Sequence, residues 1–216
     1  MSVNTKAGFS IVKYEGNGSA GAKIAHGLNS APEMIILKGL ENTYQWETQH
    51  KDISLVGAGI HLDSATAYNS GASDRWNSQR ADSKVVTVSS NGAVNETGKD
   101  YIMYSWHSVP GYSAFGKYTG NNGGNFIYTG FRPAFVMFKK ITPAESWVIA
   151  DNARDPDNPT QKYLIADTDG IEGSQDGMYD FLSNGFVMKT QTQNNSGQDF
   201  IYVAFAETPL NFANAR

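Results

Sequence analysis

The long polar segment 63–83 contains side chains that could bind a ligand, namely Tyr68, Arg75, Trp76 and Arg80. An aromatic ring in such a loop can stack on the face of a sugar while charged and amide groups bond its hydroxyls. The alternative is that Trp76 folds back against the core, because a Trp side chain is seldom left wholly in water. The residue types leave both interpretations open.

A second polar cluster, Arg154-Asp155-Pro156-Asp157-Asn158, follows an apolar run around Trp147. Loop residues of this kind often contact ligands, so Arg154, Asp155 and Asn158 are candidate ligand-binding residues. A structural role is the favoured interpretation, because Asp155 can fix a turn before Pro156 and Arg154 can pair with a carboxylate such as Asp151.

Residues that support catalysis or metal binding are sparse. The chain has no cysteine and therefore no thiolate nucleophile or sulfur-based zinc site. Its four histidines show no metal-ligand spacing, although His50 and His61 are placed to meet across neighbouring strands. Carboxylates in Asp167-Thr168-Asp169-Gly170 weakly resemble a calcium loop, but the sequence is also that of an ordinary turn. We predict no metal and no cofactor.

The glycine pattern Gly16-Asn17-Gly18-Ser19-Ala20-Gly21 matches the G-x-G-x-x-G of dinucleotide sites, which requires a helix to follow. Gly27 and Pro32 come too soon after it for a useful helix. The segment is therefore predicted to be a surface turn.

Composition excludes two classes of partner. The formal net charge is −4 and no run of Lys or Arg exists, which disfavours nucleic-acid binding. No apolar stretch approaches the roughly 20 residues that a membrane-spanning helix needs, so we expect no membrane insertion.

The chain repeats itself. Pro32–Lys38 matches Pro133–Lys139, Trp46 matches Trp147, and Gly98–Ile102 matches Gly197–Ile201, in the same order along the sequence. Phe9–Asn17 matches the segment that ends at Asn121. These matches predict two tandem copies, at residues 8–110 and 111–210.

Each copy shows short apolar runs separated by Gly, Asn, Ser and Pro, which is typical of strands and turns. Strands are predicted near 9–14, 22–26, 33–38, 44–49, 59–63, 84–88 and 100–108, and near 112–118, 125–129, 134–139, 146–150, 162–166, 185–189 and 199–206. Seven short strands in about 100 residues fit a β-sandwich module. The predicted fold is all-β: two jelly-roll-like sandwich repeats, either intimately joined or merged into one sandwich.

Several motifs resemble a repeat common in bacteriophage tail-fibre and other virion proteins, especially of marine and cyanobacterial phages. They include Gly8–Tyr14, His26-Gly27-Leu28, Tyr128–Ala134, Arg154-Asp155-Pro156, Asp180–Phe186 and Ala204–Glu207. The resemblance covers nearly the whole chain and is closer in the second copy. In the first copy Trp106-His107-Ser108 replaces the Ala-Phe-Ala-Glu strand, and the Arg-Asp-Pro turn is missing.

The resemblance implies a non-enzymatic virion protein, assembled in the host cytoplasm and carried on the particle. We expect the distal, host-receptor-binding domain of a tail fibre, with a cell-surface glycan or protein and other virion proteins as partners. Fibre tips are commonly trimeric, and strands apolar on both faces, such as Phe135–Phe138, suit contacts between subunits. A capsid decoration protein is the alternative within this class, and the chain is expected to be either a fibre fragment or a small stand-alone protein.

A glycan depolymerase is an alternative from another class. Such enzymes usually need two carboxylates about 5–9.5 Å apart. Candidate carboxylates are Glu145, Asp151, Asp155, Asp157 and Glu172, but they show no paired-acid motif.

Overall fold

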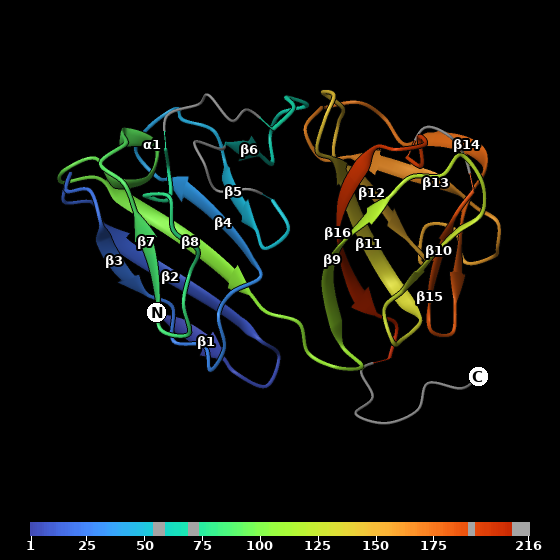
Figure 1. The fold of residues 1–216 in the computed structure, drawn as a ribbon, viewed down its shortest axis with the longest axis horizontal. Helices are drawn as coiled ribbons and strands as arrows, with labels where there is room; N and C mark the ends of the chain where they lie inside the picture. Colours follow the sequence, from blue (N-terminus) through green and yellow to red (C-terminus); the bar gives the residue numbers. More distant parts are fainter. Residues whose placement is uncertain (54–58, 69–73, 190–192, 209–216) are drawn as a thin grey trace. The chain divides into compact units, whose positions relative to one another are not determined.

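The computed structural model describes residues 1–53, 59–68, 74–189 and 193–208. The chain divides into two compact units, unit 1 at Met1–His107 and unit 2 at Ser108–Arg216. Strands make up almost all of the regular structure (Figure 1), so the all-β prediction is confirmed. No helical segment in the described part of the chain has the length and hydrophobicity required to span a membrane.

Unit 1 contains a six-stranded and a two-stranded sheet. Its elements are β1 (Ser2–Asn4), β2 (Phe9–Glu15), β3 (Ala22–Ala25), β4 (Met34–Gly39), β5 (Glu47–His50), β6 (Ile60–His61), β7 (Val85–Val88), α1 (Gly92–Asn95) and β8 (Asp100–Trp106). The larger sheet has the order β1-β2-β8-β4-β5-β6, and β3 pairs with β7 in the smaller one. Side chains from both sheets form one core, in which Ile24 and Val86 meet Leu37 and Met103. Unit 1 is therefore a β-sandwich.

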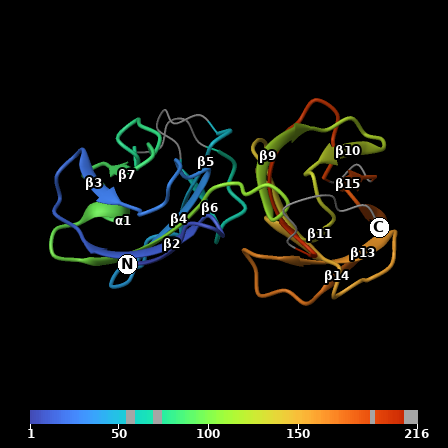
Figure 2. The ribbon, with the colours of Figure 1, turned by 90° about the horizontal axis from the view of Figure 1, so that it is seen from below.

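Unit 2 is a single eight-stranded sheet. Its strands are β9 (Ser113–Thr119), β10 (Asn125–Tyr128), β11 (Pro133–Lys140), β12 (Val148–Asp151), β13 (Thr160–Ile165), β14 (Gly173–Leu182), β15 (Gly185–Met188) and β16 (Asp199–Ala206). The order is β10-β15-β14-β13-β12-β11-β16-β9. Figure 2 shows these strands curving around the interior of the unit, where an aromatic-rich core includes Phe138, Phe181 and Phe186.

The strand pairings of unit 1 recur in unit 2. β2, β8, β4, β5 and β6 pair in the same succession as β9, β16, β11, β12 and β13, and β3 pairs with β7 as β10 does with β15. The registers also agree, because Met34 lies opposite His50 and Trp106, as Phe135 lies opposite Asp151 and Phe205. Positions in the two units can therefore be compared residue by residue.

Each strand predicted from the sequence overlaps an observed one, but three elements were not predicted: β1, α1 and β14. β14 begins with Gly173-Ser174-Gln175-Asp176-Gly177, which is typical of a turn rather than a strand. It pairs with β13 on one side and β15 on the other, and so joins two parts of unit 2 whose equivalents in unit 1 lie in separate sheets. Pairing with the two neighbouring strands has overridden the preference of the segment itself here.

A buried asparagine holds the turn that follows β2 in unit 1 and the turn that follows β9 in unit 2 in the same way. Asn95 accepts a hydrogen bond from the Asn17 main-chain nitrogen (2.9 Å) and donates to the carbonyl oxygens of Ser19 (2.9 Å) and Ser89 (3.0 Å). In unit 2 Asn194 accepts from the Asn121 nitrogen and donates to main-chain carbonyls in the same manner. Both residues are 1% exposed or less, and each donates to one buried main-chain carbonyl, that of Ser89 or that of Met188.

Candidate functional site

Arg154 of unit 2, a predicted ligand-binding residue, is engaged by its own unit. Its Nε lies 3.2 Å from Asp151 Oδ2 and its Nη1 lies 2.6 Å from Glu172 Oε2. The hydrogen bond from Arg154 lowers the pKa of the Glu172 carboxyl. The pairing of Arg154 with Asp151 thus agrees with the structural interpretation, while its role toward a ligand stays a prediction.

Asp155 and Asn158 hold the connection between β12 and β13. Asp155 Oδ2 accepts hydrogen bonds from the main-chain nitrogens of Gln161 (2.7 Å) and Lys162 (3.3 Å). Asn158 donates to the Phe181 carbonyl oxygen and accepts from the Phe181 nitrogen, both at 2.9 Å. These contacts position the turn, and a ligand role for the two residues stays a prediction.

The candidates in segment 63–83 do not form one surface. Trp76 is 1% exposed and lies in the core of unit 1, so of the two alternatives the indole folds back against the core and is not available to stack on a sugar. The guanidinium of Arg80 donates to the carbonyl oxygens of His50 (3.1 Å) and Ile53 (2.6 Å). Tyr68 is half-buried. Burial of the large indole outweighed its position in a polar stretch.

Arg75 belongs to a buried charged cluster. Its Nε lies 3.0 Å from Glu47 Oε1, and His61 Nδ1 lies 3.2 Å from Glu47 Oε2. Glu47 is opposite His61 in the β5–β6 register, so this carboxylate, and not His50, faces His61 across the two strands. The sequence had allowed His50 and His61 to meet there. The equivalent pair in unit 2 is Val148 and Ile165, which pack in or against the apolar core. Unit 1 therefore carries charges at a position that unit 2 fills with hydrocarbon.

Asp167, in the weak calcium-loop match, accepts a hydrogen bond from the main-chain nitrogen of Trp147 at 2.8 Å. Asp63 makes the same bond to Trp46 in unit 1, at 3.0 Å. Among the residues that the structure describes, no group of three or more His, Asp or Glu side chains is arranged to hold a metal ion. The contact of Asp167 is that of a turn residue.

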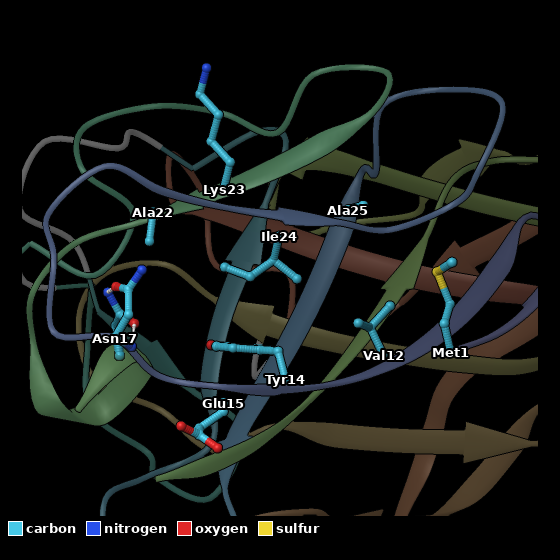
Figure 3. A pocket seen from close by; sticks show the side chains of 10 residues that line it. Met1, Val12, Tyr14, Glu15, Asn17, Ala22, Lys23, Ile24 and Ala25 are labelled. Carbon is cyan, nitrogen blue, oxygen red and sulfur yellow. Dashed lines mark hydrogen bonds between the residues drawn. The ribbon is translucent and has the colours of Figure 1, made fainter. Parts of the chain in front are cut away.

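A pocket of about 370 Å³ opens in unit 1 between β2 and β3. Figure 3 shows Val12 and Tyr14 of β2 facing Ile24 of β3 across it, whereas the Lys23 side chain points away. Its lining residues are Met1, Val12, Tyr14, Glu15, Asn17, Ala22, Lys23, Ile24, Ala25 and Asn95. The pocket is thus lined by both apolar and polar residues, with Val12 and Ile24 at its floor.

The glycine-rich segment 16–21 closes one end of this pocket. It connects β2 to β3 without a helix, which confirms the turn interpretation and excludes the dinucleotide fingerprint. Asn17 and Asn95, which hold this turn, place amide groups at that end. The Tyr14 hydroxyl donates to the Val94 carbonyl oxygen at 2.5 Å, and burial raises the pKa of Tyr14.

The exposed side chain of Glu15 lies at the outer margin, whereas Lys23 directs its ammonium away from the pocket. The pocket therefore combines an apolar floor with amide groups and a carboxylate at its margin, which suits a small amphipathic ligand.

In unit 2 the corresponding space is bridged by a side-chain amide. Asn125, the first residue of β10, donates to the Thr119 carbonyl oxygen at 2.9 Å and to Asn194 Oδ1 at 3.1 Å. Its equivalent in unit 1 is Ala22, which has no amide and leaves the gap between β2 and β3 unbridged at that point.

An aromatic ring fills more of the same space in unit 2. A Cβ on Gly116 would lie 2.7 Å from the Tyr202 ring, so the absence of a side chain at Gly116 makes room for that ring. Tyr202 also packs edge-on against Phe186, with ring centroids 5.5 Å apart. Unit 1 has Val12 and Met103 at the positions of Gly116 and Tyr202. The pocket is thus a consequence of a few side-chain differences between units that share their strand pairings.

Sequence reasoning missed this pocket, because its residues belong to ordinary-looking strands and to a turn. A signal was available in the comparison of the repeats, since Ala22 stands where the second copy has Asn125 and Val12 where it has Gly116.

No curated protein and no solved structure matches the chain. A family model described as "Domain of unknown function (DUF7483)" matches residues 1–209 and so spans both units, and the chain therefore belongs to this family.

Proposed function

We propose that the protein is a non-catalytic adhesion protein of a bacteriophage particle, the receptor-binding end of a tail fibre, and that the pocket of unit 1 binds a host-surface glycan. The resemblance of the repeats to virion proteins motivates the biological setting. The pocket between β2 and β3 is the observation that supports ligand binding.

The pocket suits a sugar for three reasons. Its volume of about 370 Å³ lies within the range of small-molecule sites, about 300–1,000 Å³. Val12 and Ile24 supply an apolar floor on which the C–H face of a pyranose can rest. Asn17 and Glu15, at the margin, offer amide and carboxylate groups to its hydroxyls.

The test is a binding titration of purified host envelope glycan against the full chain, by calorimetry. The key variant is Ala22→Phe, whose ring would occupy the pocket from β3. Lys84→Phe is the matched control, because Lys84 is exposed and lies outside the pocket lining. We expect Ala22→Phe to weaken binding at least about tenfold, or 1.4 kcal/mol, and Lys84→Phe to leave it unchanged.

Three results would count against the proposal. Equal binding by Ala22→Phe and the parent chain, with thermal melts showing both folded, would remove the pocket as the ligand site. Release of reducing ends from the glycan would identify a depolymerase instead. Labelling of intact particles on the head rather than the tail would favour a capsid decoration protein.

A further inference from the structure

β10 ends the eight-stranded sheet of unit 2, and among the described residues no strand pairs with its outer edge. The Thr129 nitrogen donates to the Asn184 carbonyl oxygen of the neighbouring turn at 3.1 Å, which sets the alternation of the β10–β15 ladder. In an antiparallel ladder the intervening residues direct their main-chain groups the other way. The N–H and C=O groups of Phe126 and Tyr128 therefore point to the open edge.

The same two residues carry exposed aromatic rings. Phe126 is 46% and Tyr128 67% exposed, whereas Ile127 between them is 6% exposed and lies in the core. Both rings lie against glycine main chain: a Cβ on Gly185 would be 3.0 Å from the Phe126 ring, and one on Gly130 would be 3.5 Å from the Tyr128 hydroxyl. The edge thus presents two positioned aromatic side chains and unpaired main-chain groups together.

The equivalent strand of unit 1 is protected. Lys23 and Ala25 of β3 stand at the positions of Phe126 and Tyr128, and Lys23 points its charge outward (Figure 3). Proteins commonly place lysine on an edge strand to prevent pairing with another chain, because a second sheet would bury the charge. β10 has no charged residue, Asn125-Phe126-Ile127-Tyr128, and so lacks this protection.

We propose that β10 pairs antiparallel with β10 of a second copy of this chain, in a register centred on Ile127. In this register Phe126 lies opposite the second copy's Tyr128, and Tyr128 lies opposite the second copy's Phe126. The two pairs would exchange four main-chain hydrogen bonds and bring an aromatic side chain opposite another on the same face.

The arrangement has two-fold symmetry and therefore closes after two copies instead of growing into a fibre. It predicts an even number of copies, in place of the trimer expected from the resemblance. We expect weak association, because so short a strand pair buries less than the roughly 1,200 Å² of a stable interface.

Sedimentation equilibrium of the full chain over a wide concentration range tests the pairing. Phe126→Lys copies the charge of β3 onto β10, and it should lower the association constant at least about tenfold. Ile171→Lys is the matched control, because Ile171 is 95% exposed in the connection between β13 and β14 and should leave association unchanged. The proposal would be overturned by a purely monomeric parent chain, or by an assembly that Phe126→Lys does not weaken. If Phe126 and Tyr128 bind glycan instead, Phe126→Lys will change the calorimetric titration and leave sedimentation unchanged.

A cysteine cross-link tests the register. In the proposed pairing Ile127 faces its own copy at a Cα separation of about 4.5 Å, within the range of a disulfide. Because the natural chain has no cysteine, Ile127→Cys should give a covalent dimer on mild oxidation, and Ile24→Cys, at the equivalent position of β3, should not. Equal cross-linking of the two variants would refute the register. These results do not depend on glycan binding in unit 1.

Discussion

Replacing Arg75 with Met should destabilise unit 1 by about 3–5 kcal/mol. The Glu47 carboxylate that Arg75 contacts is 1% exposed, and the side chains of Arg75 and His61 are only 15% and 12% exposed. The change would therefore remove the permanent cation beside a buried carboxylate. For a domain of this size the loss corresponds to a fall in Tm of roughly 12–20 °C, at about 4 °C per kcal/mol.

Removing the whole cluster should have the opposite outcome. The triple variant Glu47→Val, His61→Ile, Arg75→Met copies onto unit 1 the apolar pair that Val148 and Ile165 form in unit 2. Buried charge clusters replaced by hydrocarbon of similar volume are often neutral or stabilising by about 1–4 kcal/mol, because no charge needs to be desolvated. The triple variant should thus be at least as stable as the parent and far more stable than Arg75→Met.

Differential scanning calorimetry of the full chain provides the measurement. Arg154→Met in unit 2 is the matched control, because its ion pairs with Asp151 and Glu172 are more accessible to solvent and such pairs contribute about 0–1 kcal/mol. If Arg75→Met shifts Tm no more than Arg154→Met, or if the triple variant is as unstable as Arg75→Met, the cluster does not carry the desolvation penalty inferred for it.

Three further predictions concern side-chain packing inside each unit. Asn95→Ala and Asn194→Ala should each cost about 2–4 kcal/mol in urea unfolding, because each leaves a buried main-chain carbonyl without a donor, and a loss below 1 kcal/mol in either unit would contradict this. Burial lowers the pKa of Lys139 to about 8 in the folded chain, below its ordinary value of 10.5, so the unfolded state binds more protons between those values. Stability measured by chemical unfolding should therefore rise from pH 8 to 9.5, and Lys139→Met should flatten that rise. Gly116→Val should lower the free energy of unfolding by about 1–3 kcal/mol, because the new side chain collides with the Tyr202 ring. Adding Tyr202→Met restores the combination found in unit 1 and should recover most of that stability. Equal losses for the single and double variants would show that the two positions are not coupled.

The strand positions followed closely from local sequence because apolar runs and turn residues act over a few residues. Phe9–Glu15 and Asp199–Ala206 were predicted to within about a residue at each end. β14 was not predicted, since its Gly173–Gly177 half has no strand preference of its own and is ordered by β13. The burial of Trp76 in the core of unit 1 was not predictable from local sequence either, because a polar loop can expose an indole or turn it inward.

The sequence by itself determined the all-β class, the positions of most strands along the chain and the residues that turn the chain, because these depend on alternation, on glycine and proline, and on short-range hydrogen bonds. Only the tertiary structure decided which strand edges stay open and where space is left between them. The pocket beside Ala22 and the charged cluster around Glu47 depend on side chains brought together from different elements, and the aromatic edge at Phe126 depends on which strand pairs with β10. The chemistry of each depends on which side chains and strands lie next to it in the folded chain, and local sequence does not encode those neighbours.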